Sequence, residues 1–152
     1  MEILVDADAC PVVIKQILFK AAERTKTRVT FIANQFIKTP PSKFVTSIRV
    51  ASGFDVADNE IVKRVSDGDM VITADIPLAD EVIAKGGEAL SPRGELFTKD
   101  NIKSKLNMRD FMDTMRSTGV FDPSQQSKLG GQAPYSDKDK QAFANILNAW
   151  IR

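Results

Sequence analysis

The sequence predicts an α/β fold with three layers, in which helices flank a mostly parallel central β-sheet. Short apolar segments typical of buried strands alternate along the chain with amphipathic segments typical of helices. This alternation is characteristic of parallel sheets, where a helix connects each strand to the next. The chain has 152 residues and no internal repeat, a length typical of one domain. We therefore expect a single domain over residues 1–152.

The first strand and helix are predicted at the N-terminus. An apolar run over residues 3–5 ends in Asp6 and Asp8. Pro11 then suits the first turn of a helix, where its missing N–H is not needed. The helix is expected to reach about Glu23, because it carries an apolar face with helical spacing, namely Val13, Ile14, Ile17, Leu18 and Ala21.

Two further strands follow. Residues 28–33 are rich in β-branched and aromatic side chains, which favour strands, and this strand ends at Asn34. Residues 36–43 contain two adjacent prolines and are predicted to form a loop. Residues 44–50 are predicted to form the third strand.

The middle of the chain repeats the strand–helix order. Asp55 is expected to cap a helix over residues 56–66, with Asp58 at the N-terminal end of its apolar face. Residues 69–74 predict the central strand of the sheet, and this strand ends directly in Asp75.

The remaining chain predicts mainly helices. A short helix is expected over residues 77–85, followed by a last short strand over 88–90, and residues 97–116 are expected to be helical in their later part with a methionine-rich stripe. Residues 119–135 are predicted to be a mobile loop before a final helix. Ser136 and Asp139 have the spacing of a capping box. The final helix is expected to dock through one apolar face, formed by Phe143, Ile146, Leu147 and Trp150.

The composition excludes several classes of function. The chain contains no histidine and one cysteine, which removes Ser-His-Asp and Cys-His catalysis and most zinc sites. A bound metal would need oxygen ligands, which favours Mg²⁺ or Mn²⁺. No apolar run is long enough for a membrane span, and no signal peptide is apparent. We therefore expect a cytoplasmic protein without membrane contact.

The charges are distributed unevenly along a chain of net charge +1. Residues 1–50 carry 8 basic and 4 acidic side chains, residues 51–95 carry 4 and 10, and residues 96–152 carry 9 and 6. This pattern suits a carboxylate cluster beside a surface that binds a polyanion. It is equally consistent with scattered charges that only keep the protein in solution.

The acids at the strand ends predict a metal site. The carboxyl ends of parallel strands lie at one edge of a sheet, so Asp6, Asp8 and Asp75 should converge there. In an extended segment Asp6 and Asp8 would share a side. Clustered carboxylates repel one another unless a cation binds between them. The alternative is that one of the first two acids only caps a helix or turn.

Six motifs resemble the YaiI/YqxD family of bacterial proteins, and the resemblance covers essentially the whole chain. The motifs are Val5-Asp-Ala-Asp-Ala-Cys-Pro11, Ala57-Asp-Asn-Glu-Ile61, Ile72-Thr-Ala-Asp-Ile-Pro-Leu-Ala-Asp80, Pro92-Arg-Gly-Glu-Leu-Phe-Thr98, Met108-Arg-Asp-Phe-Met112 and Gly130-Gly131.

That family is grouped with PIN-like domains, whose studied members are metal-dependent ribonucleases. The resemblance implies a PIN-like domain with catalytic and metal-binding acids at Asp6, Asp58 and Asp75. It implies supporting metal ligands at Asp8 and Asp80. The paired Asp-Ala-Asp followed by Cys-Pro departs from the usual PIN pattern.

Other polar residues are candidates for substrate binding. Arg93, after the last expected strand, suits bidentate contact with phosphate, although a salt bridge is equally consistent. Asn34 ends the second strand at the same edge. Lys99 and Lys103 suit contact with an RNA backbone. Cys10, by contrast, is interpreted as a small packed thiol, because neighbouring acids raise its pKa.

These features predict a Mg²⁺- or Mn²⁺-dependent nuclease that acts on RNA. One alternative is a phosphatase of the haloacid-dehalogenase type, with Asp6 as nucleophile and Asp8 as acid/base. Another is a module that binds metal or RNA without catalysis.

Overall fold

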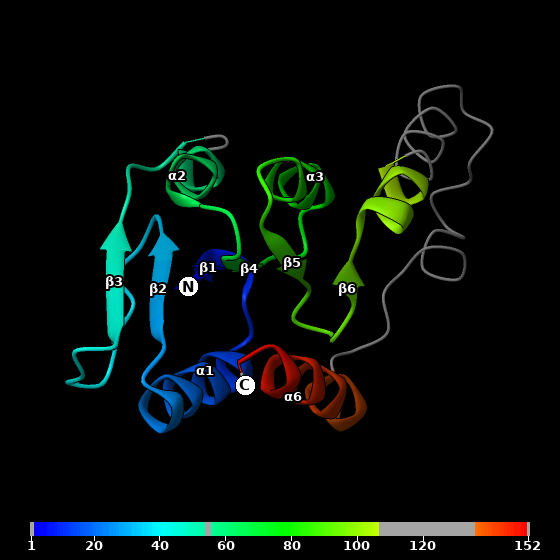
Figure 1. Ribbon diagram of the computed structural model, residues 1–152. Coiled ribbons are helices and arrows are strands. Elements are labelled where there is room, and N and C mark those ends of the chain that lie inside the picture. Colours follow the sequence, from blue (N-terminus) through cyan, green and yellow to red (C-terminus); the bar gives the residue numbers. More distant parts are fainter. Residues whose placement is uncertain (1, 54–55, 107–135, 152) are drawn as a thin grey trace, which may run out of the picture.

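The structure is a computed structural model that describes residues 2–53, 56–106 and 136–151 (Figure 1). Asp55, the methionine-rich stripe and the expected mobile loop at 119–135 lie outside the described residues. The elements in chain order are β1 (Glu2–Asp6), the 3₁₀ turn η1 (Ala7–Ala9), α1 (Val12–Thr25), β2 (Arg28–Ala33), β3 (Val45–Arg49), α2 (Val56–Arg64), β4 (Met70–Ile72), α3 (Ile76–Ala84), β5 (Glu88–Leu90), β6 (Leu96–Phe97) and α6 (Asp137–Ile151).

The strands form one sheet in the order β3-β2-β1-β4-β5-β6. The first five are mutually parallel where they pair, and only β6 runs antiparallel, beside β5. β1 is therefore a central strand with β2 and β4 as its neighbours. Because these strands are parallel, the carboxyl ends of β1, β2, β4 and β5 lie at one edge of the sheet, here called the carboxyl edge.

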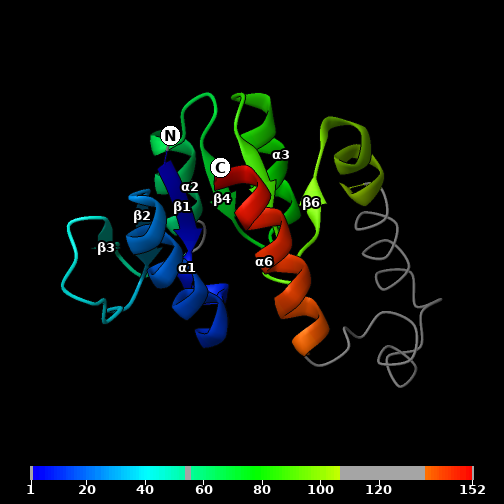
Figure 2. The same cartoon turned by 60° about the horizontal axis from the view of Figure 1, so that its bottom comes forward.

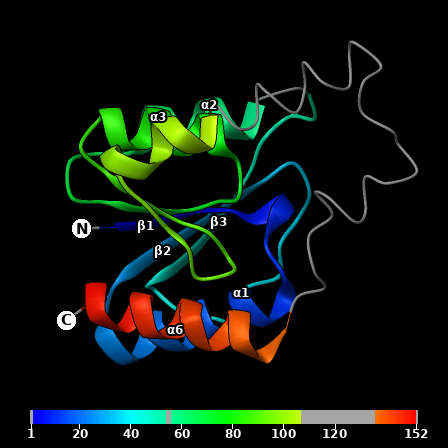
Figure 3. The ribbon, with the colours of Figure 1, turned by 90° about the vertical axis from the view of Figure 1, so that its right-hand side faces the viewer.

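Helices cover both faces of the sheet and make three layers, as predicted. Figures 1 and 3 show α2 and α3 on one face and α1 and α6 on the other. Side chains of β1 alternate between these faces: Ile3 and Val5 pack in the core beneath α1 and α6, whereas Leu4 packs in the core beneath α2 and α3. Burial on both faces explains why the central strands β1 and β4 are mostly continuous apolar runs.

The final helix docks as the sequence predicts. Phe143 and Leu147 of α6 are fully buried in the same core as α1, and Figure 2 shows the two helices on the same face of the sheet. The capping box is also confirmed, since the backbone N–H groups of Ser136 and Asp139 each donate to the other residue's side chain, at 3.2 and 3.4 Å.

Three predictions about the elements were wrong in detail. Residues 7–9 leave the extended conformation and form η1, so Asp6 and Asp8 do not follow strand alternation. The strand at residues 88–90 is not the last, because β6 follows it after the turn around Gly94. The central strand β4 has only three residues, although the N–H of Thr73 still donates to the carbonyl of Leu90 beyond its end.

The helix expected late in residues 97–116 begins earlier, at residue 99, and the structure describes it as far as residue 106. Thr98 and Asn101 cap it reciprocally, each side chain accepting from the other residue's backbone N–H, at 3.1 and 2.8 Å. Among the described residues, no helix has the length and apolar character that a membrane crossing needs.

Candidate functional site

Asp6 is the buried carboxylate at the carboxyl edge. It is the last residue of β1 and is only 8 % exposed. Along the strand it has the same parity as Leu4, so its side chain lies on the face covered by α2 and α3. A buried carboxylate needs a compensating polar partner or a cation, because burial disfavours its charge.

Thr73 connects Asp6 to the next acid in the site. Its hydroxyl donates to Asp6 Oδ2 at 3.1 Å, and its oxygen accepts from the backbone N–H of Asp75 at 3.0 Å. One side chain thereby ties the end of β1 to the connection between β4 and α3. Thr73 is itself buried, so this bridge is shielded from water. From the sequence, Thr73 was a candidate to hold metal-bound water or to satisfy backbone groups, because it stands at a strand end two residues before Asp75; its bond to the Asp6 carboxylate was not predicted.

Asp75 lies at the carboxyl edge and is also the residue that begins a helix. It is the N-cap of α3, and its Oδ1 accepts from the N–H of Leu78 at 3.0 Å. Pro77 follows within the first turn, where a proline is well tolerated. Capping fixes the Asp75 side chain at the edge of the sheet, and its partly buried carboxylate acts electrostatically on Asp6.

Asp8 is exposed and lies on η1, immediately after β1. Its Oδ2 accepts from the backbone N–H of Asn34 at 2.8 Å, which ties η1 to the end of β2. Neither Asp6 nor Asp8 makes a side-chain cap to the following helix: Asp6 has no cap hydrogen bond, and Pro11 is the N-cap of α1. The explanation that one of these two acids caps the following helix is therefore wrong.

The pKa of Asp6 is raised above its ordinary value of 3.8. Burial is the largest cause; the hydrogen bond from Thr73 acts in the opposite direction, and the charges of Asp75 and Asp8 raise the pKa further. Asp75 and Asp8 therefore each lie close enough to Asp6 to disfavour its charge. A cation between them would relieve this repulsion and favour the ionised carboxylate.

Two other predicted acids come from the helices on this face. Asp58 lies in the first turn of α2, and α2 begins soon after the carboxyl end of β3, which places Asp58 toward the carboxyl edge. Asp80 lies one turn into α3, and its Oδ1 is 3.4 Å from Lys103 Nζ. The structure thus joins Asp80 to the helix at 99–106 rather than to Asp6.

The four residues predicted to bind substrate separate into two groups. Asn34 and Arg93 lie at the carboxyl edge; Asn34 contacts Asp8 through its backbone, and the guanidinium of Arg93 is 3.1 Å from the Asp139 carboxylate of α6. Lys99 follows the end of β6, which is antiparallel to β5, so it lies at the opposite edge. Lys103 is paired with Asp80. The structure does not bring these two lysines to Asp6.

Two acids, Asp6 and Asp75, lie near one another at the carboxyl edge. Within the described ranges, no group of three or more histidine, cysteine or acidic side chains is arranged to hold a metal ion. Mg²⁺ commonly binds through one or two carboxylates and retains several waters. The Thr73 hydroxyl bonds the Asp6 carboxylate and the backbone N–H of Asp75, and so fixes these two residues relative to one another.

Cys10 lies beside the site but does not suit a nucleophile. The thiol is buried, and burial raises its pKa to about 12; Lys15 acts in the opposite direction and Asp6 raises it further. A thiol with this pKa is fully protonated at neutral pH. Packing of Cys10 in the core beneath α1 agrees with the sequence interpretation.

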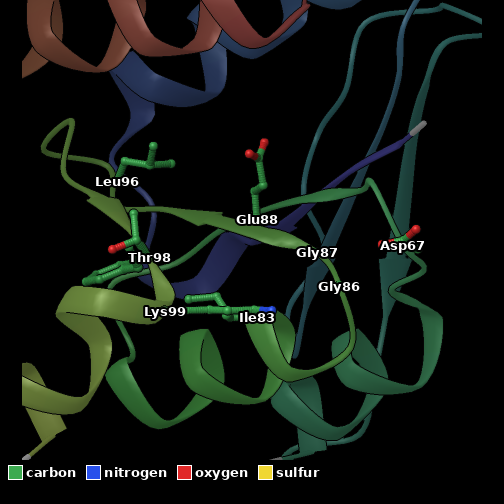
Figure 4. Close-up of a pocket in the computed structure, with 9 residues that line it drawn as sticks. Asp67, Ile83, Gly86, Gly87, Glu88, Leu96, Thr98 and Lys99 are labelled. Atoms are coloured by element: carbon green, nitrogen blue, oxygen red, sulfur yellow. The ribbon is translucent and has the colours of Figure 1, made fainter.

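A hollow lies at the opposite edge of the sheet from Asp6. This cavity of about 350 Å³ is bounded by the start of β5 on one side and by the residues after β6 on the other (Figure 4). Its lining includes Asp67, Gly86 and Gly87 on the first side and Thr98 and Lys99 on the second. The acids at the carboxyl edge do not contribute to it.

Comparisons with known proteins now identify the family. A sequence model described as "Uncharacterized BCR, YaiI/YqxD family" matches residues 4–152. The chain belongs to this family. Relatives named UPF0178 protein are similar over nearly their whole length: one from Shewanella amazonensis is 64% identical, covering 99% of this chain and 97% of its own.

Further members of the YaiI/YqxD family agree with this assignment. A UPF0178 protein from Pectobacterium carotovorum is 62% identical, with 99% of this chain and 96% of its own covered. One from Yersinia pestis is 60% identical, with 100% and 95% covered. The family resemblance predicted from the motifs is confirmed. No solved structure matches the chain significantly.

Proposed function

We propose that this YaiI/YqxD-family protein is a Mg²⁺- or Mn²⁺-dependent ribonuclease that hydrolyses phosphodiester bonds at the carboxyl edge of its sheet. The observation that carries the proposal is the buried Asp6 carboxylate, whose pKa is raised by burial and by its neighbours Asp75 and Asp8. A protein that folds with mutually repelling carboxylates at one edge gains stability from a cation there. The cytoplasm, which contains the cell's RNA, is the compartment that this function implies.

Asp6 and Asp75 are proposed to hold the metal directly, with Asp58 completing the site from α2. The Thr73 hydroxyl fixes the Asp6 carboxylate by donating to Oδ2, which leaves Oδ1 for the cation. The cap to Leu78 occupies Asp75 Oδ1 and likewise leaves Oδ2. A bound Mg²⁺ or Mn²⁺ supplies charge that polarises a phosphoryl oxygen and lowers the pKa of water.

Asp8 is proposed to act from the solvent side. Its exposed carboxylate, held by the Asn34 N–H at 2.8 Å, is positioned to accept a proton from water near the site or to bind the metal's outer waters. Asp80 is proposed as a supporting acid through its charge alone, because its carboxylate contacts Lys103. Arg93 is a candidate for phosphate contact that would first have to leave Asp139.

The test is cleavage of a single-stranded RNA by purified protein with Mn²⁺. Asp6→Asn should lower the rate by about 100-fold or more, since a metal site supplies several kcal/mol of transition-state stabilisation. Asp67→Asn is the matched control, because the same substitution is made at an exposed acid on the opposite edge, and it should retain activity. Equal cleavage by wild type and Asp6→Asn would contradict the proposal.

The phosphatase alternative gives the same residue a different role. A nucleophilic Asp6 must be ionised, whereas burial and the adjacent carboxylates favour its protonated form. A stable complex with beryllium fluoride in fluorine NMR would favour that alternative. Metal-dependent stabilisation or RNA binding without turnover would favour the non-catalytic module.

A further inference from the structure

Two large apolar side chains are exposed in the part of the chain that the structure describes, Val12 at 67% and Phe36 at 76%. Val12 is close to Asp8 in the sequence, and Phe36 is close to a residue that is hydrogen-bonded to Asp8. Val12 follows Asp8 by four residues, at the start of α1. Phe36 follows Asn34, whose N–H is bonded to Asp8, by two residues. Two residues span at most about 7 Å, so the ring of Phe36 is held near the carboxyl edge.

The outward orientation of Phe36 is set by its neighbours. Ile37 is buried in the core beneath α1, and Asn34 is fixed on the other side by its hydrogen bond to Asp8. Pro40 and Pro41 then restrict the backbone that follows. Phe36 cannot turn inward without removing Ile37 from the core. The exposed ring is therefore a consequence of how the loop is anchored.

The loop also carries a lysine close to Phe36. Lys38 follows Phe36 by two residues and is exposed, and residues 34–44 contain no acidic side chain. The other lysine of the loop, Lys43, lies at the opposite edge of the sheet, just before β3. An exposed aromatic ring close to an exposed ammonium group is a combination that binds single-stranded nucleic acid, because a base stacks on the ring and a phosphate pairs with the cation. A base-paired strand cannot use the ring in this way, since the faces of its bases are covered by their neighbours in the stack.

We propose that Phe36 is a stacking platform for an unpaired nucleobase, and that it holds a single strand next to Asp6 and Asp8. Lys38 contacts the phosphate beside the stacked base. This inference rests on the proposed function and adds to it the part of the substrate that is recognised. Recognition by stacking tolerates any base, so the subsite provides affinity for single strands without a sequence preference.

The test compares binding of two oligomers that differ only in their bases. Fluorescein-labelled decaadenylate and an abasic decamer of equal charge are titrated with Asp6→Asn protein, in which cleavage does not consume the probe, and anisotropy is measured. Adding Phe36→Ala should weaken binding of decaadenylate by about tenfold and leave the abasic decamer unchanged. Phe36→Trp should retain the affinity. Lys38→Ala is the matched control and should weaken binding of both oligomers alike.

Three results would overturn the stacking subsite. In the first, Phe36→Ala leaves the affinity for decaadenylate unchanged. In the second, it weakens the binding of both oligomers equally. In the third, it changes only the self-association measured by sedimentation velocity, in which case the exposed ring is a contact between copies. If the wild-type protein does not cleave RNA but the stacking results are as expected, only the ribonuclease proposal is overturned. Absence of any oligonucleotide binding by the protein would overturn both.

Discussion

The proposed function depends first on the Asp6 carboxylate. It is buried, it accepts one hydrogen bond from Thr73, and two further carboxylates act on it. The positions of Asp6 at the end of β1 and of Asp75 shortly after β4 were predictable from the sequence, because an acid follows each apolar run. The Thr73 bridge was not, since a threonine near a strand end commonly bonds to the backbone instead.

The raised pKa of Asp6 predicts a dependence of stability on pH. The protonated form is favoured in the folded state, so this contribution to stability is complete below the ordinary pKa of 3.8 and is lost as pH rises through the folded-state pKa. The free energy of unfolding of Asp6→Asn, measured with urea and a chelator, should therefore rise relative to wild type across that interval. Asp67→Asn should show no such trend, and a constant difference for Asp6→Asn would contradict the prediction.

At the scale of elements, the long amphipathic segments were predictable and the short ones were not. The apolar faces of α1 and α6 specify both helices and their docking, and the capping box at Ser136 marks where α6 begins. η1 and β6 have three and two residues, too short for any periodicity. They depend on tertiary contacts, such as the bond between Asp8 and Asn34.

The turn between β5 and β6 packs closely against α6. Gly94 has a φ of +84°, and a Cβ there would lie 2.5 Å from the Cβ of Ala142 and from the backbone nitrogen of Phe143. Gly94→Ala should cost about 3 kcal/mol, from the backbone conformation and the clash together. Gly68→Ala is the matched control, since its φ is +87° but nothing lies within 4 Å of the added Cβ.

Gly68→Ala should cost only about 1 kcal/mol, from the backbone conformation alone. Urea unfolding of both variants measures the difference. Equal losses would show that the backbone of Gly94, rather than its contact with α6, requires glycine.

At the scale of the whole molecule, the parallel sheet gathers acids that are far apart in the sequence. Asp6 and Asp75 are 69 positions apart in number, yet the pairing of β1 with β4 brings the ends of their strands together. The sequence predicts this convergence, because parallel strands share an edge. It does not predict which charged residues lie far from these acids. Lys99 lies at the opposite edge because β6 runs antiparallel to β5.

The most direct measurement of the central claim is the thermal stability of wild type and Asp75→Asn with added Mn²⁺. Asparagine is as good an N-cap as aspartate, so this substitution removes the charge of Asp75 while the cap of α3 remains. Saturating Mn²⁺ should raise the Tm of wild type by about 5 °C or more and leave that of Asp75→Asn nearly unchanged. An equal rise in both proteins, or none in wild type, would contradict a metal site at the carboxyl edge.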